Sequence, residues 1–270
     1  MATADEIPYI NYSCYLNTYR EGEQFVPHHF LSMVIDGEME LNDGTQRYLF
    51  RKGQVYFACK NQLLKFTKRP TDEQGFKSLS IRFSDELLQE LARAEGYHPP
   101  QEHKKVSAFT DLSEAKYLPF FMESLLQYQD LLENKAPDLL ILKQKEALML
   151  LFKEAPQLRD ALLDFSAPYK INLEAFMQQN FHFNVGLERF AYLTGRSLAT
   201  FKRDFQKIFQ TSPRSWLQHK RLQEAYYLIK EKQQRPSSVY LDLGFEDLSH
   251  FSFAFKKEFG LAPTELLKIT

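Results

Sequence analysis

The feature that most constrains this chain is an internal repeat in its last third. Moving residues 187–217 forward by fifty positions onto residues 237–267 aligns eight identical residues out of 31. In the first copy these residues are Leu193, Leu198, Phe201, Phe205, Lys207, Phe209, Pro213 and Leu217. Self-similarity at a fixed period is typical of a structural unit that the chain uses more than once. We therefore expect two related modules in this region.

Phenylalanines recur at intervals of four within each copy and indicate a helix. They are Phe201, Phe205 and Phe209 in the first copy, and Phe251, Phe255 and Phe259 in the second. Side chains four residues apart lie on one face of a helix. We interpret the rings as hydrophobic core, so any function of these helices depends on the residues around the rings.

The residues around the aromatic helices predict two helix-turn-helix units. A short apolar segment ends at a turn that contains Gly195 or Gly244, and Ser197 or Asp247 can then cap the phenylalanine helix. A helix, a three- or four-residue turn with glycine and a second helix form the helix-turn-helix motif, which suits a DNA groove. The amphipathic segment 213–232 predicts a linker helix that holds the two units at a fixed separation.

Charge is distributed unevenly along the chain. Residues 166–270 hold 15 Lys and Arg against 10 Asp and Glu, whereas residues 1–165 hold 19 against 25. The formal net charge of −1 therefore conceals a basic C-terminal region and an acidic N-terminal region. Such an asymmetry suggests that the basic region meets a polyanion such as nucleic acid.

The first 83 residues predict a β-rich region. Short apolar runs alternate with turn sequences, and the strongest turn signal is Asn42-Asp43-Gly44, because Asn and Gly tolerate positive φ angles. The expected strands cover Tyr9–Tyr19, Phe25–Ile35, Glu38–Leu41, Tyr48–Phe50, Gln54–Ala58, Leu63–Thr67 and Phe76–Phe83. Many short strands with regular turns favour a small sandwich or barrel.

Residues 84–165 predict helices. Ser84 can cap the first of them, and two longer segments follow at 113–133 and 138–153. Pro119 kinks the first long segment or marks its true start. The segment 138–153 carries more apolar surface than one core-facing stripe needs. It is either a helix sandwiched in the core or a subunit interface built from paired helices.

Composition and hydropathy exclude several classes of protein. The 270 residues are 44% hydrophobic and 26% charged, which excludes a disordered or collagen-like chain. The two cysteines, Cys14 and Cys59, are too few for a disulfide framework or a four-thiolate zinc site. The first residues lack a signal-peptide pattern, and no run of about 18 apolar residues is long enough for a membrane span. We expect a cytoplasmic protein.

Candidate metal and catalytic residues do not form a convincing site. His28 and His29 are adjacent on an expected strand and therefore point to opposite faces, whereas a cupin metal site needs two histidines on one face. His98 and His103 lack metal-ligand spacing. Nucleophile-elbow, P-loop and dinucleotide motifs are missing. The sequence predicts no enzyme, no metal and no cofactor.

Two stretches of the repeat region carry a family resemblance. They are GRSLATFKRDFQKIFQTSPRSWLQHKRLQEAYYLI, which begins at Gly195, and GFEDLSHFSFAFKKEFGLAPTELL, which begins at Gly244. Together they resemble the DNA-binding domain of the AraC/XylS family of bacterial transcription regulators, over about residues 171–267. Many members of that family place a cupin-like barrel with helices before this domain, as an effector-binding or dimerising domain.

The resemblance implies which residues contact DNA. Base contacts are expected from one exposed stripe on each second helix, and contacts near phosphates from His250 and Lys256. The full set of expected DNA-binding residues is Ser197, Ala199, Thr200, Lys202, Arg203, Gln206 and Lys207 in the first unit, and Asp247, Ser249, His250, Ser252, Phe253 and Lys256 in the second. Lys202 and Arg203 suit the acceptors on guanine; the alternative is that they lie on a solvated helix face.

Three residues depart from the family pattern. Phe253 replaces a usual arginine, so it either contacts a thymine methyl or packs against its neighbours, and we favour packing because Tyr240 is also unusually bulky. Tyr240 itself stands where a small alanine is usual. Gln210 stands where glycine usually ends the first recognition helix, as Gly260 does in the second.

These observations predict an α+β protein of two domains. Residues 1–165 form a regulatory or dimerisation domain, with a cupin-like β-barrel at about 1–83 and helices at about 84–165. Residues 166–270 form an all-α DNA-binding domain. A ligand in the barrel would be hydrophobic or planar, because the candidate interior residues are apolar and aromatic: Phe30, Met33, Phe57, Phe66 and Phe83.

The expected function is a sequence-specific transcription regulator controlled by a ligand or partner. The resemblance implies double-stranded DNA, RNA polymerase, a second copy of the chain and a small-molecule or protein effector as partners. One alternative is an interaction module that has lost specific DNA binding, and another is a cupin-type enzyme. The basic pair Lys202 and Arg203 argues against the first, and the missing convergent polar cluster argues against the second.

Overall fold

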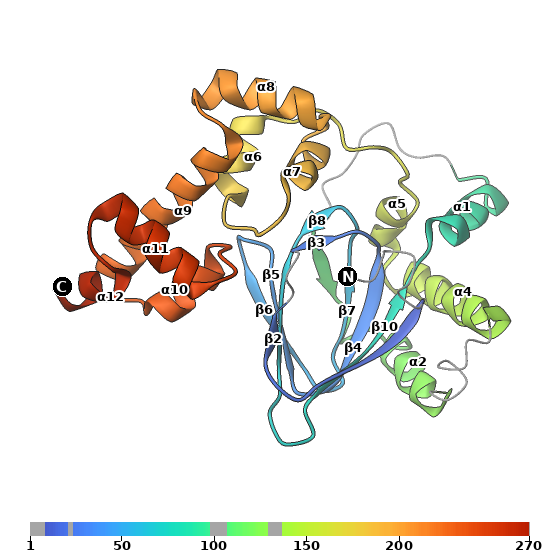
Figure 1. Ribbon diagram of the computed structural model, residues 1–270. Coiled ribbons are helices and arrows are strands. Elements are labelled where there is room, and N and C mark those ends of the chain that lie inside the picture. The colour runs from blue at the N-terminus through green and yellow to red at the C-terminus, as the bar shows by residue number, and fades with distance from the viewer. Residues whose placement is uncertain (1–8, 21–23, 98–106, 129–136, 270) are drawn as a thin grey trace. The chain divides into compact units, whose positions relative to one another are not determined.

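The computed structural model describes residues 9–20, 24–97, 107–128 and 137–269 and is shown in Figure 1. The chain forms two compact units. The first unit comprises the described residues within 1–21 and 26–166, and the second comprises those within 22–25 and 167–270. Each unit is described by itself below.

The first unit contains short antiparallel strands. They are β1 (Ile10–Tyr15), β2 (Tyr19–Arg20), β3 (Phe25–Val26), β4 (Phe30–Asp36), β5 (Glu38–Asn42), β6 (Arg47–Arg51), β7 (Val55–Ala58), β8 (Gln62–Leu63), β9 (Lys65–Arg69), β10 (Phe76–Arg82) and β11 (Phe109–Asp111). The hairpin between β5 and β6 turns at the expected site. Gly44 has a φ of 88°, and the Asp43 carboxylate accepts hydrogen bonds from the backbone of Thr45 and Gln46, each at 2.8 Å.

The strands form three sheets within the described residues. A five-stranded sheet has the order β1-β10-β4-β7-β11, a four-stranded sheet has the order β2-β9-β5-β6, and β3 pairs with β8. The β-rich N-terminal region is thus confirmed, but closure into a cupin-like barrel is not, because each of these strand orders is open. The larger sheets instead enclose a core between them that contains Met39, Leu41, Phe50 and Phe76.

The five-stranded sheet buries side chains on both of its faces. Met33, Phe57 and Phe83 belong to a core shared with helices, whereas Phe30 and Phe66 pack against the core between the sheets. Alternation along a strand sends neighbouring side chains to opposite faces. The five residues suggested as a barrel interior therefore do not line one common cavity.

Helices cover one face of this sheet, as Figure 1 shows. They are α1 (Asp85–Ala94), α2 (Leu118–Leu125), η2 (Leu126–Tyr128), α4 (Pro137–Glu154), η3 (Pro156–Leu158) and α5 (Arg159–Leu162). Ser84 caps α1 as expected, since its hydroxyl accepts the Leu87 N–H at 3.2 Å. Pro119 marks the start of α2 and does not kink a longer helix.

Helix α4 is buried on one side only. Ala147, Leu148 and Leu151 are fully buried, whereas Leu142 is 63% exposed and Met149 is 69% exposed. A helix sandwiched in the core would bury both sides, so this interpretation is wrong for the isolated unit. The exposed apolar side chains lie seven residues apart, which places them on one stripe of the helix.

The two adjacent histidines lie before β4 and not on a strand. Pro27 has no N–H to donate, and β3 ends at Val26, so His28 and His29 occupy an irregular link. His29 is buried, and its Nδ1 accepts the Lys60 N–H at 3.2 Å. The other pair considered as metal ligands, His98 and His103, lies outside the described residues.

Two negative findings apply to the residues that the structure describes. No helix among them is long and apolar enough to cross a membrane. No group of three or more His, Cys, Asp and Glu side chains among them is arranged to hold a metal ion.

The second unit is helical. Its helices are α6 (Leu173–Asn180), α7 (Leu187–Leu193), α8 (Leu198–Phe209), α9 (Pro213–Lys230), α10 (Pro236–Asp242), α11 (Leu248–Phe259) and α12 (Pro263–Ile269). The sequence repeat appears as two helix-turn-helix pairs, α7 with α8 and α10 with α11. Helix α9 joins them, as expected for the amphipathic linker.

Candidate nucleic-acid interface

Helix α8 presents one polar face and buries the other. Phe201 and Phe205 are fully buried, while Lys202, Arg203 and Gln206 are exposed. Ser197 caps the helix, because its hydroxyl accepts the Thr200 N–H at 3.2 Å. Because the cap fixes the start of α8 at Leu198, Lys202 and Arg203 lie in its first two turns. The structure therefore brings the expected basic residues together on one accessible surface, with Ala199 beside them.

The single acidic residue of α8 is paired within the unit. The Asp204 carboxylate lies 3.1 Å from Nε of Arg196 and 3.6 Å from Nζ of Lys170. The hydrogen bond from Arg196 lowers the pKa of Asp204 below its ordinary value. Arg196 also donates to the carbonyl oxygen of Ile171 at 3.0 Å. The negative charge is thus matched before any polyanion approaches, so the outer face of α8 keeps a basic character.

The turn between α7 and α8 requires glycine. Gly195 has a φ of 65°, and a Cβ at this position would collide with the backbone of Tyr169. Gly244 occupies the equivalent turn of the second pair with a φ of 80°, and a Cβ there would lie 2.9 Å from the carbonyl oxygen of His182. Both turns combine the left-handed backbone with close packing, so other residues are strained there.

Helix α11 repeats the arrangement with different chemistry. The Asp247 carboxylate caps it by accepting the His250 N–H at 2.6 Å. Phe251 and Phe255 are buried, as their counterparts are in α8. The expected contact residues Ser249, His250, Phe253 and Lys256 are exposed, and Ser252 is half-buried.

Phe253 does not pack against its neighbours. Its side chain is 71% exposed, whereas the Tyr240 ring lies 6.4 Å from the ring of buried Phe251. The expectation that Phe253 packs against its neighbours is therefore wrong. Tyr240 fills space beside the core, and Phe253 projects from the outer face of α11.

The two recognition helices end in the same left-handed conformation. Gln210 has a φ of 55° after α8, and Gly260 has a φ of 80° after α11. The Gln210 side chain donates to the carbonyl oxygen of Lys207 at 2.8 Å, which gives the last turn of α8 an additional partner. Glutamine thus substitutes for the usual glycine without changing how the helix ends.

The linker helix α9 contributes to the packing of both pairs. Ser212 caps it, and Pro213 is its first residue. Near its start, the Trp216 ring lies 4.7 Å from the ring of Phe209. Further along, Leu222 and Ile229 are buried in the core that contains the phenylalanines of α11. The separation between the two pairs is consequently fixed by a single helix.

The Arg221 side chain of α9 connects the loop before α7 with the turn between α10 and α11. It donates to the carbonyl oxygens of Phe181 and Phe183, each at 2.7 Å, and of Gly244 at 3.0 Å. Burial lowers the pKa of Arg221 to about 10. Beside it, the Asn184 amide donates to the Glu246 carboxylate at 2.8 Å. The loop before α7 is therefore tied to the turn between α10 and α11.

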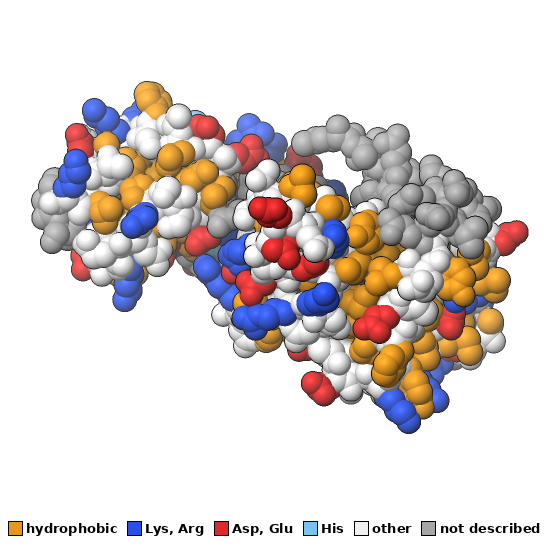
Figure 2. Space-filling model, turned by 90° about the horizontal axis from the view of Figure 1, so that it is seen from below, with side chains coloured by type: hydrophobic (Ala, Val, Ile, Leu, Met, Phe, Trp, Pro, Cys, Tyr) orange, Lys and Arg blue, Asp and Glu red, His pale blue; other side chains and the backbone are white. Residues whose placement is uncertain are grey.

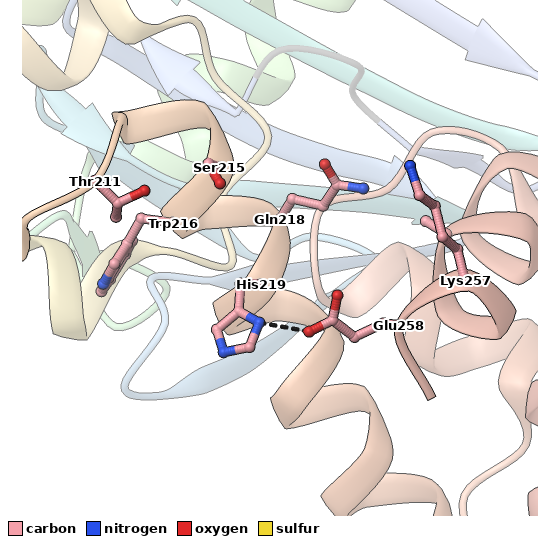
Figure 3. Close-up of a pocket in the computed structure, with 8 residues that line it drawn as sticks. Thr211, Ser215, Trp216, Gln218, His219, Lys257 and Glu258 are labelled. Atoms are coloured by element: carbon pink, nitrogen blue, oxygen red, sulfur yellow. Dashed lines mark hydrogen bonds and ion pairs between the residues drawn. The ribbon is translucent and has the colours of Figure 1, made fainter. Parts of the chain in front are cut away.

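A polar pocket of about 380 Å³ lies between α9 and α11 (Figure 3). Its lining residues are Thr211, Ser215, Trp216, Gln218, His219, Ala254, Lys257 and Glu258. Nδ1 of His219 lies 2.7 Å from the Glu258 carboxylate, and Figure 3 shows the ends of Gln218 and Lys257 on another side of the pocket.

Sequence reasoning missed this pocket. Its residues come from α9, α11 and the connection between α8 and α9. His219 and Glu258 are 39 positions apart, so no short motif joins them. The one available signal was Lys257, which matches Lys207 in the repeat. Lys207 is among the expected DNA-binding residues, whereas its counterpart Lys257 is not.

Comparisons with known proteins cover both units. Residues 29–161 match the model of the ExsA N-terminal regulatory domain, and residues 190–269 match the model of a helix-turn-helix domain. Among curated proteins, the HTH-type transcriptional regulator ExsA of Pseudomonas aeruginosa is 23% identical over 239 residues, which cover 86% of this chain and 83% of ExsA.

Two further comparisons cover a similar share of the chain. The virulence regulon transcriptional activator VirF of Yersinia enterocolitica is 23% identical over 247 residues, or 87% of each chain. A crystal structure of ToxT from Vibrio cholerae aligns with a TM-score of 0.39 and 12% identity, over 96% of this chain and 97% of that chain. The two matched domains, together with the regulators ExsA and VirF, lead to one assignment. The chain belongs to the AraC/XylS family of transcription regulators, with an N-terminal regulatory domain and a C-terminal helix-turn-helix domain that binds DNA.

Proposed function

We propose that this protein binds a specific sequence in double-stranded DNA through α8 and α11, each in its own major groove. The observation that carries this proposal is the repeated geometry. Two capped helices bury the same phenylalanine face, expose the opposite face and are held by one linker helix. Helix-turn-helix pairs fixed in this way suit successive major grooves on one side of the duplex, about 34 Å apart.

The two recognition helices contact different parts of the DNA. Arg203 and Lys202 on α8 contact guanine, because their donors fit the O6 and N7 acceptors in the major groove. Lys256 and His250 on α11 lie where they can approach phosphates, which position a protein without selecting a sequence. Thr200 and Ser197, joined by a 3.0 Å hydrogen bond at the start of α8, adjoin the expected contact surface.

The polar pocket extends this interface between the grooves. Lys257 supplies a cation, and Thr211 and Ser215 supply hydroxyls near the start of α9. The Glu258 carboxylate that also lines the pocket is hydrogen-bonded to His219. This combination suits the phosphate backbone where it passes from one groove to the next.

The N-terminal unit supplies control and assembly in this proposal. A small molecule or a protein bound by that unit sets the DNA-binding activity of the second unit. The bound protein then acts on RNA polymerase in the cytoplasm as an activator, as the similarity to the transcriptional activator VirF suggests.

A second copy of the chain pairs through the exposed face of α2 and α4. Leu142 and Met149 on α4 and Phe120 on α2, which is 72% exposed, form the apolar part of this face. Figure 2 shows hydrophobic side chains gathered in the same part of the first unit, with Lys and Arg at the margin. The Glu154 carboxylate accepts the N–H groups of Tyr117 and Leu118 at 2.8 and 2.9 Å, so the start of α2 is tied to the end of α4. Apolar area of this kind is typical of an interface.

The test is selection of DNA sites from a random duplex library, followed by footprinting. The expected footprint of one protomer covers two major grooves one helical turn apart. A variant with Lys202→Ala and Arg203→Ala loses the enriched sequence, whereas Lys232→Ala, an exposed residue after α9, retains it. Protection of a single groove per protomer, or no enriched sequence, would contradict the proposal.

A further inference from the structure

The outer face of α11 carries an unusual exposed ring. Phe253 is 71% exposed and lies on the same stripe as Ser249 and Lys256, opposite the buried face of the helix. Both Ser249 and Ser252 are small, so neither reaches as far from the helix as the phenyl ring. Among the described residues of α11, the ring is thus the most prominent apolar group on the surface expected to face DNA.

Lysine and arginine side chains are missing from the first turns of the same face. Ser252 donates its hydroxyl proton to the carbonyl oxygen of Leu248 at 2.8 Å, which leaves that hydroxyl with acceptor capacity only. The basic residues of α11, Lys256 and Lys257, lie in its last turn. By contrast, α8 exposes Lys202 and Arg203 in its first two turns. The first turns of α11 therefore lack the cationic donors that recognise guanine.

The major groove offers one apolar group to such a surface. Thymine exposes a 5-methyl group there, and apolar side chains including phenylalanine contact it. An exposed ring on a recognition helix loses its water on contact with that methyl, which favours binding.

We propose that α11 selects thymine through contact between the Phe253 ring and the thymine 5-methyl group. This inference rests on the proposed function, because it requires α11 to occupy a major groove. It adds the base class that the second helix recognises. The two copies of the repeat then differ in the kind of contact that selects a base: α8 uses hydrogen bonds, and α11 uses an apolar contact.

The experiment removes only the methyl group. A site obtained by selection with the full chain is resynthesised with uracil in place of each thymine, one position at a time, in the groove assigned to α11 by footprinting. Uracil pairs as thymine does but lacks the methyl. At one position or two adjacent positions, uracil weakens binding by the intact protein about fourfold, which corresponds to about 0.8 kcal/mol for one buried methyl-sized group.

Variants of Phe253 complete the test. Phe253→Ala binds the thymine site more weakly and no longer distinguishes thymine from uracil, whereas Phe253→Leu keeps part of the distinction. Arg203→Ala is the matched control on the other helix: its affinity is lower, but its sensitivity to uracil is unchanged. Thermal unfolding shows that all three variants are folded, and the exposure of Phe253 predicts little change in their stability.

Three results would overturn the inference. Uracil has no effect at any position in the α11 groove, or it affects Phe253→Ala as strongly as the intact protein. In the third, Phe253→Ala binds DNA normally but activates transcription poorly, which would assign the ring to a protein partner. A selection that enriches no sequence would instead overturn the proposed function itself, and the two failures are therefore distinguishable.

Discussion

The Arg221 guanidinium donates a 3.0 Å hydrogen bond to the carbonyl oxygen of Gly244, although the two residues belong to different helical segments 23 positions apart. Gly244 lies in the turn between α10 and α11, and Arg221 lies on the linker α9. The same guanidinium binds the loop before α7. One side chain therefore fixes the orientation of the second helix-turn-helix pair against the first.

Removal of this side chain is expected to loosen the spacing between the two pairs. Arg221→Met keeps the aliphatic volume but removes one donor from each of three carbonyl oxygens, of which only that of Phe183 keeps another among the described residues, the Val185 N–H at 3.2 Å. The expected cost is roughly 2–3 kcal/mol in unfolding free energy. The intact protein loses affinity steeply when one base pair is inserted between the two contacted grooves, and Arg221→Met loses much less. Fluorescence anisotropy on operators of different spacing measures this. Equal spacing dependence in both proteins would show that Arg221 acts on stability alone.

Substitution of Arg203 on α8 and of Lys256 on α11 is expected to weaken DNA binding in different ways. Arg203→Ala costs about 1–3 kcal/mol on the selected site and relaxes the preference at one base pair. Lys256→Ala weakens binding to all sequences and lowers the slope of log K against log salt by about one unit. Binding isotherms at several salt concentrations, on selected and scrambled DNA, separate the two effects. The same sequence-independent loss in both variants would reject this division of roles.

The exposed face of α4 is expected to hold two copies of the chain together. Leu142→Glu and Met149→Glu each place a charge where an apolar contact forms, and each costs about 2 kcal/mol or a factor of about 30 in dimer affinity. Sedimentation velocity of the full chain at micromolar concentration then shows monomers. Glu146→Gln, an exposed neighbour on the same helix, leaves the dimer intact. A monomeric unsubstituted chain would reject the interface.

Acid is expected to weaken the first unit through His29. Burial, followed by the nearby charge of Lys60, lowers the pKa of His29 to about 3, while the unfolded chain keeps the ordinary value of 6.5. Between these two values the unfolded state binds more protons, so stability is complete above pH 6.5 and falls as the pH falls. The loss is at most about 1.4 kcal/mol per pH unit, or about 2 kcal/mol between pH 6.5 and 5.

Denaturation followed by circular dichroism at several pH values measures this loss. The fluorescence of Trp216, the single tryptophan, reports the second unit separately. His29→Gln shows a smaller dependence on pH over the same range, whereas His250→Gln in the second unit does not change the transition of the first. An unchanged pH dependence in His29→Gln would reject His29 as the source.

Phe253 and Tyr240 are expected to contribute independently to stability. Phe253→Arg changes an exposed side chain and alters the unfolding free energy by less than about 0.5 kcal/mol. Tyr240→Ala removes packing beside Phe251 and destabilises the second unit. Because Phe253 is 71% exposed and Tyr240 packs near Phe251, the double variant equals the sum of the single variants within about 0.5 kcal/mol. A larger deviation in thermal unfolding would show that they are coupled.

Much of the second unit could be predicted from local sequence. Ser197 and Asp247 were identified as caps, and both accept the N–H group three residues later. A capping side chain and a four-residue aromatic interval act within one or two helical turns, so the chain shows them directly. The contact residues themselves came from the family resemblance. For α8 the periodicity agreed with them, since residues opposite a buried face are exposed.

The remaining features depend on contacts between distant residues. Phe253 was expected to pack because Tyr240 is bulky, but the direction of a side chain depends on what surrounds it in space, and Tyr240 packs near Phe251. The strand β11 pairs with β7 across more than fifty residues and has only three residues, too few for a periodic signal. Whether the sheets close is likewise decided by strand pairing and twist, which alternation alone does not specify.

Helix α9 has a consequence for how this protein can diverge. Its first turns complete the core of one helix-turn-helix pair, and its last turns complete the core of the other. Deletion of either pair would expose the apolar side chains of α9 that pack against it. The second pair is consequently retained for folding whatever its outer face recognises, and that face is free to change its chemistry. A duplicated motif built in this way allows one copy to recognise a new DNA sequence while the other copy keeps the sequence that it recognised before.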